Sequence, residues 1–360
     1  MEFGLSNQQT LLQESIANFL KRTGSLERVK RFVKDGEVRA DDVWAGLCEL
    51  GIPGLLIDER HGGIGCSLLD AALVAETLGS RVAPVPFAAT VVMAPLAIGL
   101  AGSDAQKSRW LPALAEGRAI AGAALTEAVS RREDALVQSD GKTLSGKALF
   151  VLDFAADVYL VADATGGLFL VEAAAPGLKR RALTTIDKTR SIGELVFENV
   201  PADRLAGSDD RAVRTRVIDA GRIMLAADTL GAAEHMLDRS VAYSKERMQF
   251  GRPIGSFQAV KHMCAEMAAE LEPCRALMWY AAHAFDAMPD EARLAACHLK
   301  AHLAEVGTFV ARTATEVHGG IGFTDELGLH LWFKRIGANR QLLGGPDQVR
   351  EEAARLQQLI

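Results

Sequence analysis

The sequence lacks the features that mark export, membrane spanning and disulfide scaffolds. Its five cysteines among 360 residues are widely spread without Cys-x-x-Cys spacing, so neither a disulfide framework nor a zinc site is indicated. The N-terminus has no basic-then-apolar order. One uncharged stretch, residues 82–103, is about as long as a membrane span but contains three prolines. We expect a cytoplasmic protein with no membrane partner, in which residues 82–103 form a buried helix-turn-helix.

The chain also lacks a large excess of charge of either sign. The chain has 46 acidic and 40 basic residues, a formal net charge of −6, and no block of Lys or Arg. A basic patch is the usual electrostatic mark of a protein that binds phosphate backbones, so nucleic acid is not an expected partner. With 49% hydrophobic residues, the chain is long enough for two or three domains with substantial cores.

Hydrophobic periodicity divides the chain into three segments. Residues 1–118 are typical of helices, beginning with an amphipathic helix from Asn7 to Phe32 for which Ser6 is the N-cap. Short β-type runs bounded by turns occupy residues 119–208 and favour an antiparallel sheet or small barrel. Long helical runs fill residues 209–360 and favour a four-helix bundle. We therefore expect an α+β fold, mainly α, with an N-terminal helical domain, a central antiparallel β domain and a C-terminal four-helix bundle.

The same periodicity sets bounds for the other expected elements. The helices are expected at 40–50, 68–78, 104–115, 213–247, 257–287 and 291–318. The strands are expected at 119–125, 148–152, 158–162, 168–173 and 193–200.

Sequence motifs for several common chemistries are absent. There is no three-glycine dinucleotide fingerprint, no P-loop, no His-Glu-x-x-His and no Gly-x-Ser-x-Gly. His298 and His302 lie four residues apart, but without a third ligand nearby we expect no metal. Glycine clusters do occur at 61–67, 248–255, 317–323 and 342–348, and Arg247, Arg252, Lys334 and Arg335 lie near them as possible phosphate partners. These residues indicate a helical protein with a β domain that binds a phosphorylated ligand.

Two longer runs resemble the acyl-CoA dehydrogenases. They are YSKERMQFGRPIGSFQAVKH at 243–262 and TEVHGGIGFTDELGLHLWFKR at 315–335. The segments at 58–79, 125–127 (Leu-Thr-Glu) and 196–207 are also similar to that family, so the resemblance covers nearly the whole chain. It implies FAD bound between subunits, removal of an α-proton by a glutamate, hydride transfer to the flavin, an acyl-CoA substrate and electron-transfer flavoprotein as acceptor.

The resemblance assigns cofactor contacts to six positions. Five of them would serve the flavin of a neighbouring subunit. The six are Arg247 at the pyrophosphate, Gln258 near the adenosine half, Glu316, Gly319 and Gly320 along the same FAD, and Thr126 on the flavin-ring side.

The flavin-ring side departs from the family pattern. Members usually follow Leu-Thr-Glu with a glycine-rich loop, but residues 128–133 here contain no glycine. The positions of the family's tryptophan and threonine near the flavin hold Phe150 and Leu152. A hydrogen bond to the flavin is therefore expected to be missing.

The positions of the catalytic base also depart from the family pattern. The two positions at which the family carries its glutamate hold Leu343 and Gly221, so no catalytic residue is assigned. Asp219 lies two residues from Gly221, which is about 200° of rotation on a helix, so we expect it to face away.

Three hypotheses follow from this asymmetry. The chain completes the flavin site of a glutamate-bearing partner, as in the α2β2 assemblies of bacterial steroid and bile-acid side-chain dehydrogenases, which it resembles. Alternatively, it is a self-sufficient homo-oligomer with a different base. In the third hypothesis it is a binding protein that keeps only the fold.

Overall fold

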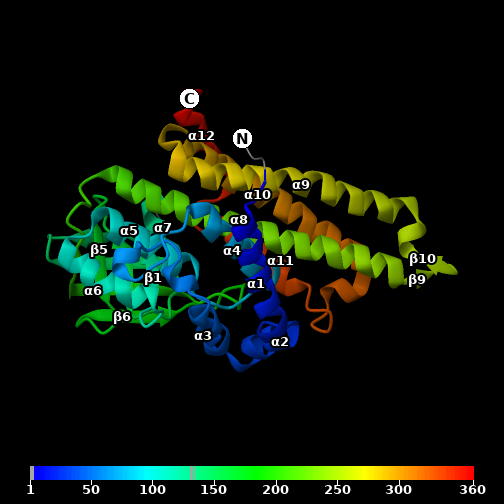
Figure 1. Cartoon of the computed structure of the whole chain (residues 1–360), viewed down its shortest axis with the longest axis horizontal. Helices are drawn as coiled ribbons and strands as arrows, with labels where there is room; N and C mark the ends of the chain where they lie inside the picture. Colours follow the sequence, from blue (N-terminus) through cyan, green and yellow to red (C-terminus); the bar gives the residue numbers. More distant parts are fainter. Residues whose placement is uncertain (1–3, 130–131, 133) are drawn as a thin grey trace.

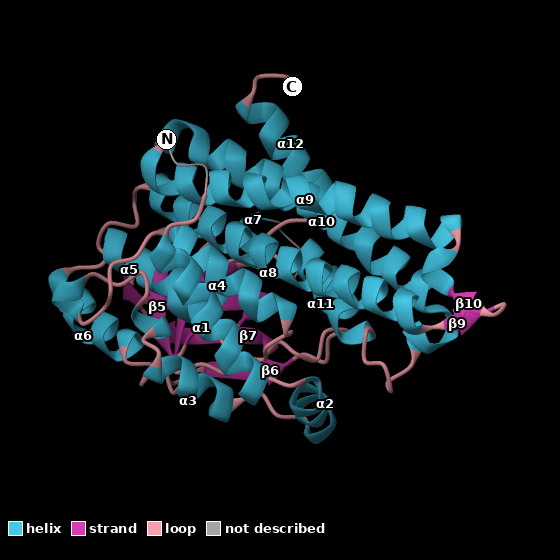
Figure 2. Ribbon diagram, turned by 45° about the vertical axis from the view of Figure 1, so that its right-hand side comes forward, coloured by secondary structure: helices cyan, strands magenta, loops and turns pink. Residues whose placement is uncertain are grey.

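The computed structural model describes residues 4–129, 132 and 134–360, and it places helices on either side of one curved sheet (Figures 1 and 2). The first segment is helical, as expected. Its helices are α1 (Asn7–Thr23), α2 (Leu26–Asp35), α3 (Asp41–Glu49), α4 (Leu68–Ser80), α5 (Ala94–Ala101) and α6 (Asp104–Ala115).

The prediction of one helix from Asn7 to Phe32 is wrong in its length. The helix ends at Thr23 and a new one begins at Leu26, because Gly24 stops α1 and Ser25 caps α2 by accepting a hydrogen bond from the Arg28 N–H. Ser6 does cap α1, and it forms a capping box with Gln9.

The predicted helix-turn-helix at 82–103 is also wrong. The structure has an irregular turn and then one continuous helical run, a π-helical segment from Ala88 to Met93 that passes directly into α5. Pro95 is the second residue of α5 and follows the π-helical segment directly, so the change from π-helical to α-helical pairing occurs at the residue that has no N–H to donate. The stretch is almost entirely buried, as its lack of charge indicated.

The central segment forms a sheet with the strand order β6-β7-β3-β1-β4-β5-β8, in which β2 also pairs with β3. Neighbouring strands are antiparallel except β1 and β4, which run parallel. The strands are β1 (Ala121–Ala124), β2 (Val137–Ser139), β3 (Thr143–Leu152), β4 (Val158–Ala162), β5 (Leu168–Glu172), β6 (Leu178–Ala182), β7 (Ile192–Pro201) and β8 (Asp203–Arg204). The sequence did not predict β2, β6 or β8. β2 and β8 are only three and two residues long, and β6 (LKRRA) is largely exposed and has no apolar alternation.

The last segment is built on three long helices that lie side by side (Figure 1). They are α8 (Arg211–Glu246), α9 (Gln258–Ala287) and α10 (Pro289–His318). The short helices α11 (His330–Gln341) and α12 (Pro346–Leu356) pack against them, and a small hairpin of β9 (Met248–Gln249) and β10 (Arg252–Pro253) joins α8 to α9. The three long helices begin and end within two residues of their predicted bounds.

A buried ionic network joins the bundle to the β domain. The Asp228 carboxylate on α8 accepts two hydrogen bonds from the Arg335 guanidinium on α11, at 3.0 and 2.9 Å. Arg335 also donates to Thr189 in the loop between β6 and β7, and Arg190 Nη2 lies 3.1 Å from Asp228 Oδ1. Burial alone would raise the pKa of Asp228, but the two guanidinium groups lower it to about 2. The network therefore fixes the β6–β7 loop against α11, beside the cavity described next.

Candidate functional site

Five of the six predicted cofactor contacts lie at one end of the bundle. Because α8, α9 and α10 alternate in direction, the C-terminal ends of α8 and α10 meet the N-terminal end of α9 there (Figure 1). All five residues are exposed. The five residues are Arg247, Gln258, Glu316, Gly319 and Gly320.

The paired glycines leave open backbone at this end. Gly319 ends α10 with φ 63° and ψ −144°, a conformation that residues with a side chain rarely adopt. A Cβ placed on either Gly319 or Gly320 would meet no atom within 4 Å. A ligand can therefore approach both peptide groups closely.

The sixth residue, Thr126, lies elsewhere. It begins α7 (Thr126–Val129) directly after β1, is 1% exposed, and donates a hydrogen bond from Oγ1 to the Phe150 carbonyl oxygen at 3.2 Å. Within one protomer the structure thus separates Thr126, at the β domain, from the group at the far end of the bundle.

Thr126 lines a cavity of about 440 Å³ between the β domain and α11, which we call the ring cavity. Phe150, at φ 50°, forms part of its wall, and the Arg132 guanidinium lies over the Phe150 ring at 4.6 Å from its centre. The other walls come from the β6–β7 loop and the last turn of α11, and the complete lining is Thr126, Arg132, Phe150, Thr184, Thr185, Ile186, Asp187, Arg190, Ile192, Gly337, Ala338, Gln341 and Leu342.

The two family positions for the base meet each other in space. A Cβ on Gly221 would lie 2.6 Å from Leu343 Cδ1 and 2.9 Å from Met93 Sδ. Leu343 is 1% exposed and has φ 57°. An apolar side chain therefore fills the place that a carboxylate would need, and neither position supplies a base.

Asp219 belongs to a different cluster. Its carboxylate lies 3.5 Å from Arg222 Nη1 and 3.5 Å from Arg293 Nη1, while both arginines also pair with Glu352 of α12. Burial raises the pKa of Asp219 to about 7, against the opposing effect of the arginines. It is not among the residues that line the ring cavity.

Asp187 and Arg190 are the ionic residues of the ring cavity that the sequence did not single out. Asp187 Oδ1 accepts hydrogen bonds from the Thr189 N–H and hydroxyl at 2.8 and 2.6 Å, and Oδ2 lies 3.9 Å from Arg190 Nε. Among the described residues, Asp187 is the only carboxylate in the cavity lining. The segment TTIDKTRS carries no motif that would have marked it.

Other expectations concern the loop after Leu-Thr-Glu and metal binding. Of residues 128–133, Ala128 and Val129 belong to α7, whereas 130, 131 and 133 lie outside the described residues. His298 Nε2 lies 3.5 Å from Gln357 Nε2. The described part of the chain has no group of three His, Cys, Asp or Glu residues that could hold a metal ion. Nor does it contain a helix with the length and apolar character needed to span a membrane.

Comparison with known proteins identifies the family. Residues 6–118 match the model of the acyl-CoA dehydrogenase N-terminal domain, and residues 211–355 match that of the C-terminal domain. The chain is 32% identical over 360 residues to the acyl-CoA dehydrogenase IpdE2 of Mycolicibacterium smegmatis, with 98% of this chain and 99% of that protein covered.

Two solved structures show the same architecture. One is the ChsE4–ChsE5 complex of Mycobacterium tuberculosis, with a TM-score of 0.92, 27% identity and all of both chains covered. The other is the Tcur3481–Tcur3483 steroid ACAD, with a TM-score of 0.88, 30% identity and 98% of each chain covered. The chain therefore belongs to the acyl-CoA dehydrogenase family, the FAD-dependent oxidoreductases that act on CH–CH groups of acyl-CoA thioesters.

Proposed function

We propose that this chain is the subunit of a heteromeric acyl-CoA dehydrogenase that completes the flavin site of a glutamate-bearing partner. The observation that carries the proposal is the contact between Leu343 and Gly221, since it leaves both family positions of the base apolar. Removal of an α-proton from a thioester needs a carboxylate within hydrogen-bond reach, so the base comes from the other subunit.

The residues at the far end of the bundle fit a dinucleotide. Arg247 is exposed and carries a charge suited to a pyrophosphate, and the open peptide groups of Gly319 and Gly320 suit close approach of a ligand. FAD, when bound, supplies a hydride acceptor that no amino-acid side chain can provide. Arg247, Gln258, Glu316 and the two glycines would hold its adenosine half.

The separation of these residues from Thr126 supports an oligomer. One end of the bundle carries the five adenosine-side residues, whereas the ring cavity lies beside the β domain. A neighbouring subunit that brings its own β domain against this end would complete a site between the two chains. We propose an α2β2 arrangement, which the two-chain naming of both similar structures supports.

The substrate and acceptor follow from the same relatives. We propose an acyl-CoA whose acyl group comes from a steroid, because one similar structure is named a steroid ACAD. We propose electron-transfer flavoprotein as the acceptor. We place the protein in the cytoplasm because all five cysteines are free thiols.

A second candidate function is a self-sufficient homo-oligomer that uses a different base. Asp187 favours it, because this carboxylate lines the ring cavity. Against it, one Asp187 oxygen already accepts two hydrogen bonds from Thr189, and the side chain is 1% exposed.

The test is co-purification with a family member encoded beside this chain, followed by mass analysis and a flavin count. The proposal predicts a complex with equal numbers of the two chains and bound FAD, and little FAD on this chain alone. A homo-oligomer with one FAD per chain would contradict it.

A further inference from the structure

Lys300, near the middle of α10, is a buried lysine that hydrogen-bonds to the backbone of α11. Its side chain is 3% exposed, and its Nζ donates to the carbonyl oxygens of Asn339 and Arg340 at 2.7 and 3.1 Å. Both carbonyls belong to the last turn of α11, where the final carbonyl groups of a helix have no partner within the helix. Lys300 therefore ties the C-terminal end of α11 to α10.

No carboxylate neutralises Lys300 directly. Within the described part of the chain it forms no ion pair, and two cations act on it, Arg222 from α8 and Arg340 from α11. Arg222 is bound to Glu352 of α12 by two hydrogen bonds at 3.0 and 2.9 Å, and Arg340 to Glu305 of α10 at 2.9 Å. A buried ammonium group without a carboxylate partner is costly, because carbonyl dipoles replace only part of its hydration.

These surroundings change the acidity of Lys300. Burial and the two neighbouring guanidinium groups lower its pKa from the ordinary value of 10.5 to about 7. Whenever the side chain reaches water, the pKa returns towards its ordinary value. The closed arrangement thus holds the proton less tightly than an open one. Closure is therefore weakest at and below pH 7, and it becomes more favourable as pH rises from about 7 to 10.5.

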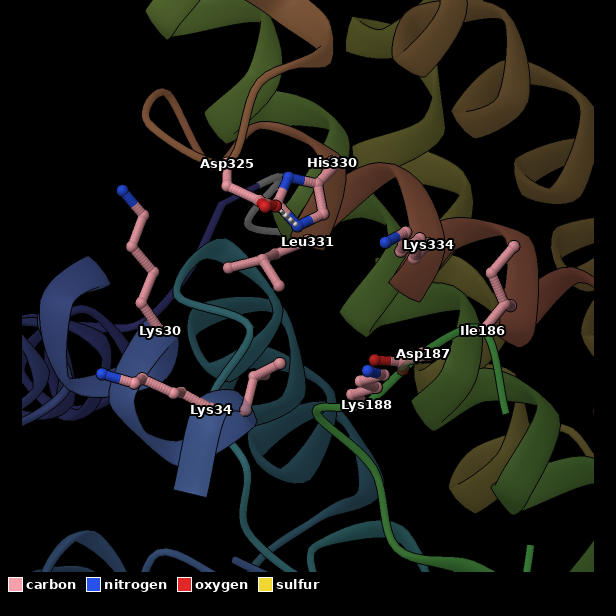
Figure 3. Close-up of a pocket in the computed structure, with 10 residues that line it drawn as sticks. Lys30, Lys34, Ile186, Asp187, Lys188, Asp325, His330, Leu331 and Lys334 are labelled. Carbon is pink, nitrogen blue, oxygen red and sulfur yellow. Dashed lines mark ion pairs between the residues drawn. The ribbon is translucent and has the colours of Figure 1, made fainter. Parts of the chain in front are cut away.

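Side chains anchor α11 as far as Asn339. Figure 3 shows the first anchor, where the His330 ring lies beside Asp325, with 3.3 Å between Nε2 and Oδ1. Farther along the helix, Arg335 binds Asp228, and the Asn339 amide donates to Asp228 Oδ1 at 2.7 Å. Opening at Lys300 can therefore affect the end of α11 while the rest of the helix stays in place.

The segment that follows, residues 340–345, is joined to the bundle through backbone carbonyls. Besides the bond from Lys300, Arg222 Nε donates to the Leu343 carbonyl oxygen at 3.0 Å. Leu343 has φ 57° and Gly344 has φ 107°, so the chain changes direction sharply here. Gln341 and Leu342 of this segment line the ring cavity. A displacement of residues 340–345 therefore alters the wall of that cavity.

We propose that Lys300 is a proton-operated latch: loss of its proton fastens residues 340–345 against α10, and protonation favours their release and the opening of the ring cavity wall. A neutral amine still has two N–H donors, one for each carbonyl, and its burial costs much less than that of a cation. The latch acts within one chain and does not depend on the proposed partner.

Two other groups of this region titrate, and their effects can be separated from that of Lys300. Asp219 Oδ1 lies 3.5 Å from Arg222 Nη1, and burial raises the pKa of Asp219 from 3.8 to about 7. Its contribution to stability therefore falls as pH rises towards 7, which is the opposite sign. Burial raises the pKa of Cys297 to about 12, so this thiol keeps its proton up to pH 9. A rise in closure between pH 7 and pH 9 belongs to Lys300.

Hydrogen–deuterium exchange of the full-length chain, followed by mass spectrometry of peptides that contain residues 340–345, measures the opening. Protection is compared from pH 7 to pH 9 after division by the intrinsic exchange rate at each pH. Lys300→Met is the test variant, because methionine has a long flexible side chain without a titrating group. Lys334→Met is the matched control, because Lys334 lies in an earlier turn of α11 and forms no ion pair with a described residue. Circular dichroism checks that both variants are folded.

The latch predicts that protection of these amides in the wild type rises with pH, by up to about tenfold for each pH unit, the limit for release of one proton. The rise should persist in Lys334→Met and be absent from Lys300→Met. Constant protection in the wild type between pH 7 and pH 9 would overturn the inference, even if Lys300→Met failed to fold. An equal rise in a folded Lys300→Met would also overturn it, since another group would then cause the effect.

Discussion

The Leu343 side chain lies directly over the backbone of Gly221, so close that a Cβ on Gly221 would lie 2.6 Å from Leu343 Cδ1. The two positions at which the family carries its glutamate thus face each other, and apolar atoms fill the space between them. In this chain both positions belong to the packed core, and a side-chain atom added at Gly221 would clash with Leu343 and Met93.

The first prediction concerns that contact. Gly221→Ala should lower the free energy of unfolding by about 1–3 kcal/mol, because the added methyl overpacks against Leu343 and Met93. Gly99→Ala is the matched control, since Gly99 is exposed in α5 with no atom within 4 Å of the added Cβ, and it should raise stability by roughly 0.5–1 kcal/mol. Urea denaturation of both variants checks the pair. Equal stability of Gly221→Ala and the wild type would contradict the contact.

The second prediction concerns the ionic network between the bundle and the β domain. Arg335→Met should destabilise the fold by about 3–5 kcal/mol, because it leaves the Asp228 carboxylate buried with one fewer cation. The double variant Asp228→Asn with Arg335→Met should lose less than Arg335→Met alone, since no uncompensated carboxylate remains at this position. Thermal unfolding of the two variants measures the difference, and a larger loss in the double variant would be inconsistent with the network described.

The third prediction concerns pH. Burial raises the pKa of Asp153 from the ordinary value of 3.8 to about 6, against the opposing hydrogen bond from the Ala89 N–H. The folded state therefore holds this proton more tightly than the unfolded state, and the Asp153 contribution to stability falls as pH rises from about 4 to 6. The difference corresponds to roughly 3 kcal/mol.

Asp153→Asn is the variant that tests this contribution. Asparagine keeps an acceptor for Ala89 and tolerates the φ of 50° at this position. Denaturation midpoints measured from pH 4 to pH 8 should fall less steeply with rising pH in the variant than in the wild type. If the midpoints changed with pH in the same way in both proteins, the Asp153 carboxyl would not titrate in this pH range and the prediction would be wrong.

The fourth prediction concerns the cofactor. In the complex with a partner, Arg247→Ala should weaken FAD retention by roughly 1.5–3 kcal/mol, because it removes a charge-assisted contact to the pyrophosphate. Arg211→Ala, at the opposite end of α8, is the control and should retain FAD normally. Flavin absorbance after extensive dialysis measures the retained FAD. Full retention in Arg247→Ala would show that Arg247 does not contact the cofactor.

Much of the fold could be predicted from local patterns. The long helices α8, α9 and α10 carry apolar residues on several faces over 30 residues or more, and that signal is strong enough to fix their bounds. The break at Gly24 was missed because apolar periodicity continues across it into α2. The parallel pairing of β1 and β4 was missed because strand direction depends on contacts far apart in the chain.

The candidate site also contains residues that the sequence could identify and residues that it could not. Arg247, Gly319 and Gly320 lie within motifs that a resemblance can identify. Asp187 does not, because the β6–β7 loop and α11 come together only in the folded chain. Similarly, the sequence shows that Gly221 and Leu343 lack a carboxylate, but only the structure shows that they are in contact.

The most direct test of the account is the oxidation of steroid and straight-chain acyl-CoAs with an artificial electron acceptor, by this chain alone and by its complex with a glutamate-bearing partner. The account predicts negligible turnover by the isolated chain, no full rescue by Leu343→Glu, and turnover by the complex that is about 10²–10⁴-fold higher, the usual contribution of a general base. Turnover of saturated acyl-CoAs at ordinary enzyme rates by the isolated wild-type chain, with one FAD per subunit, would contradict it. Loss of that turnover in Asp187→Asn would then identify Asp187 as the base.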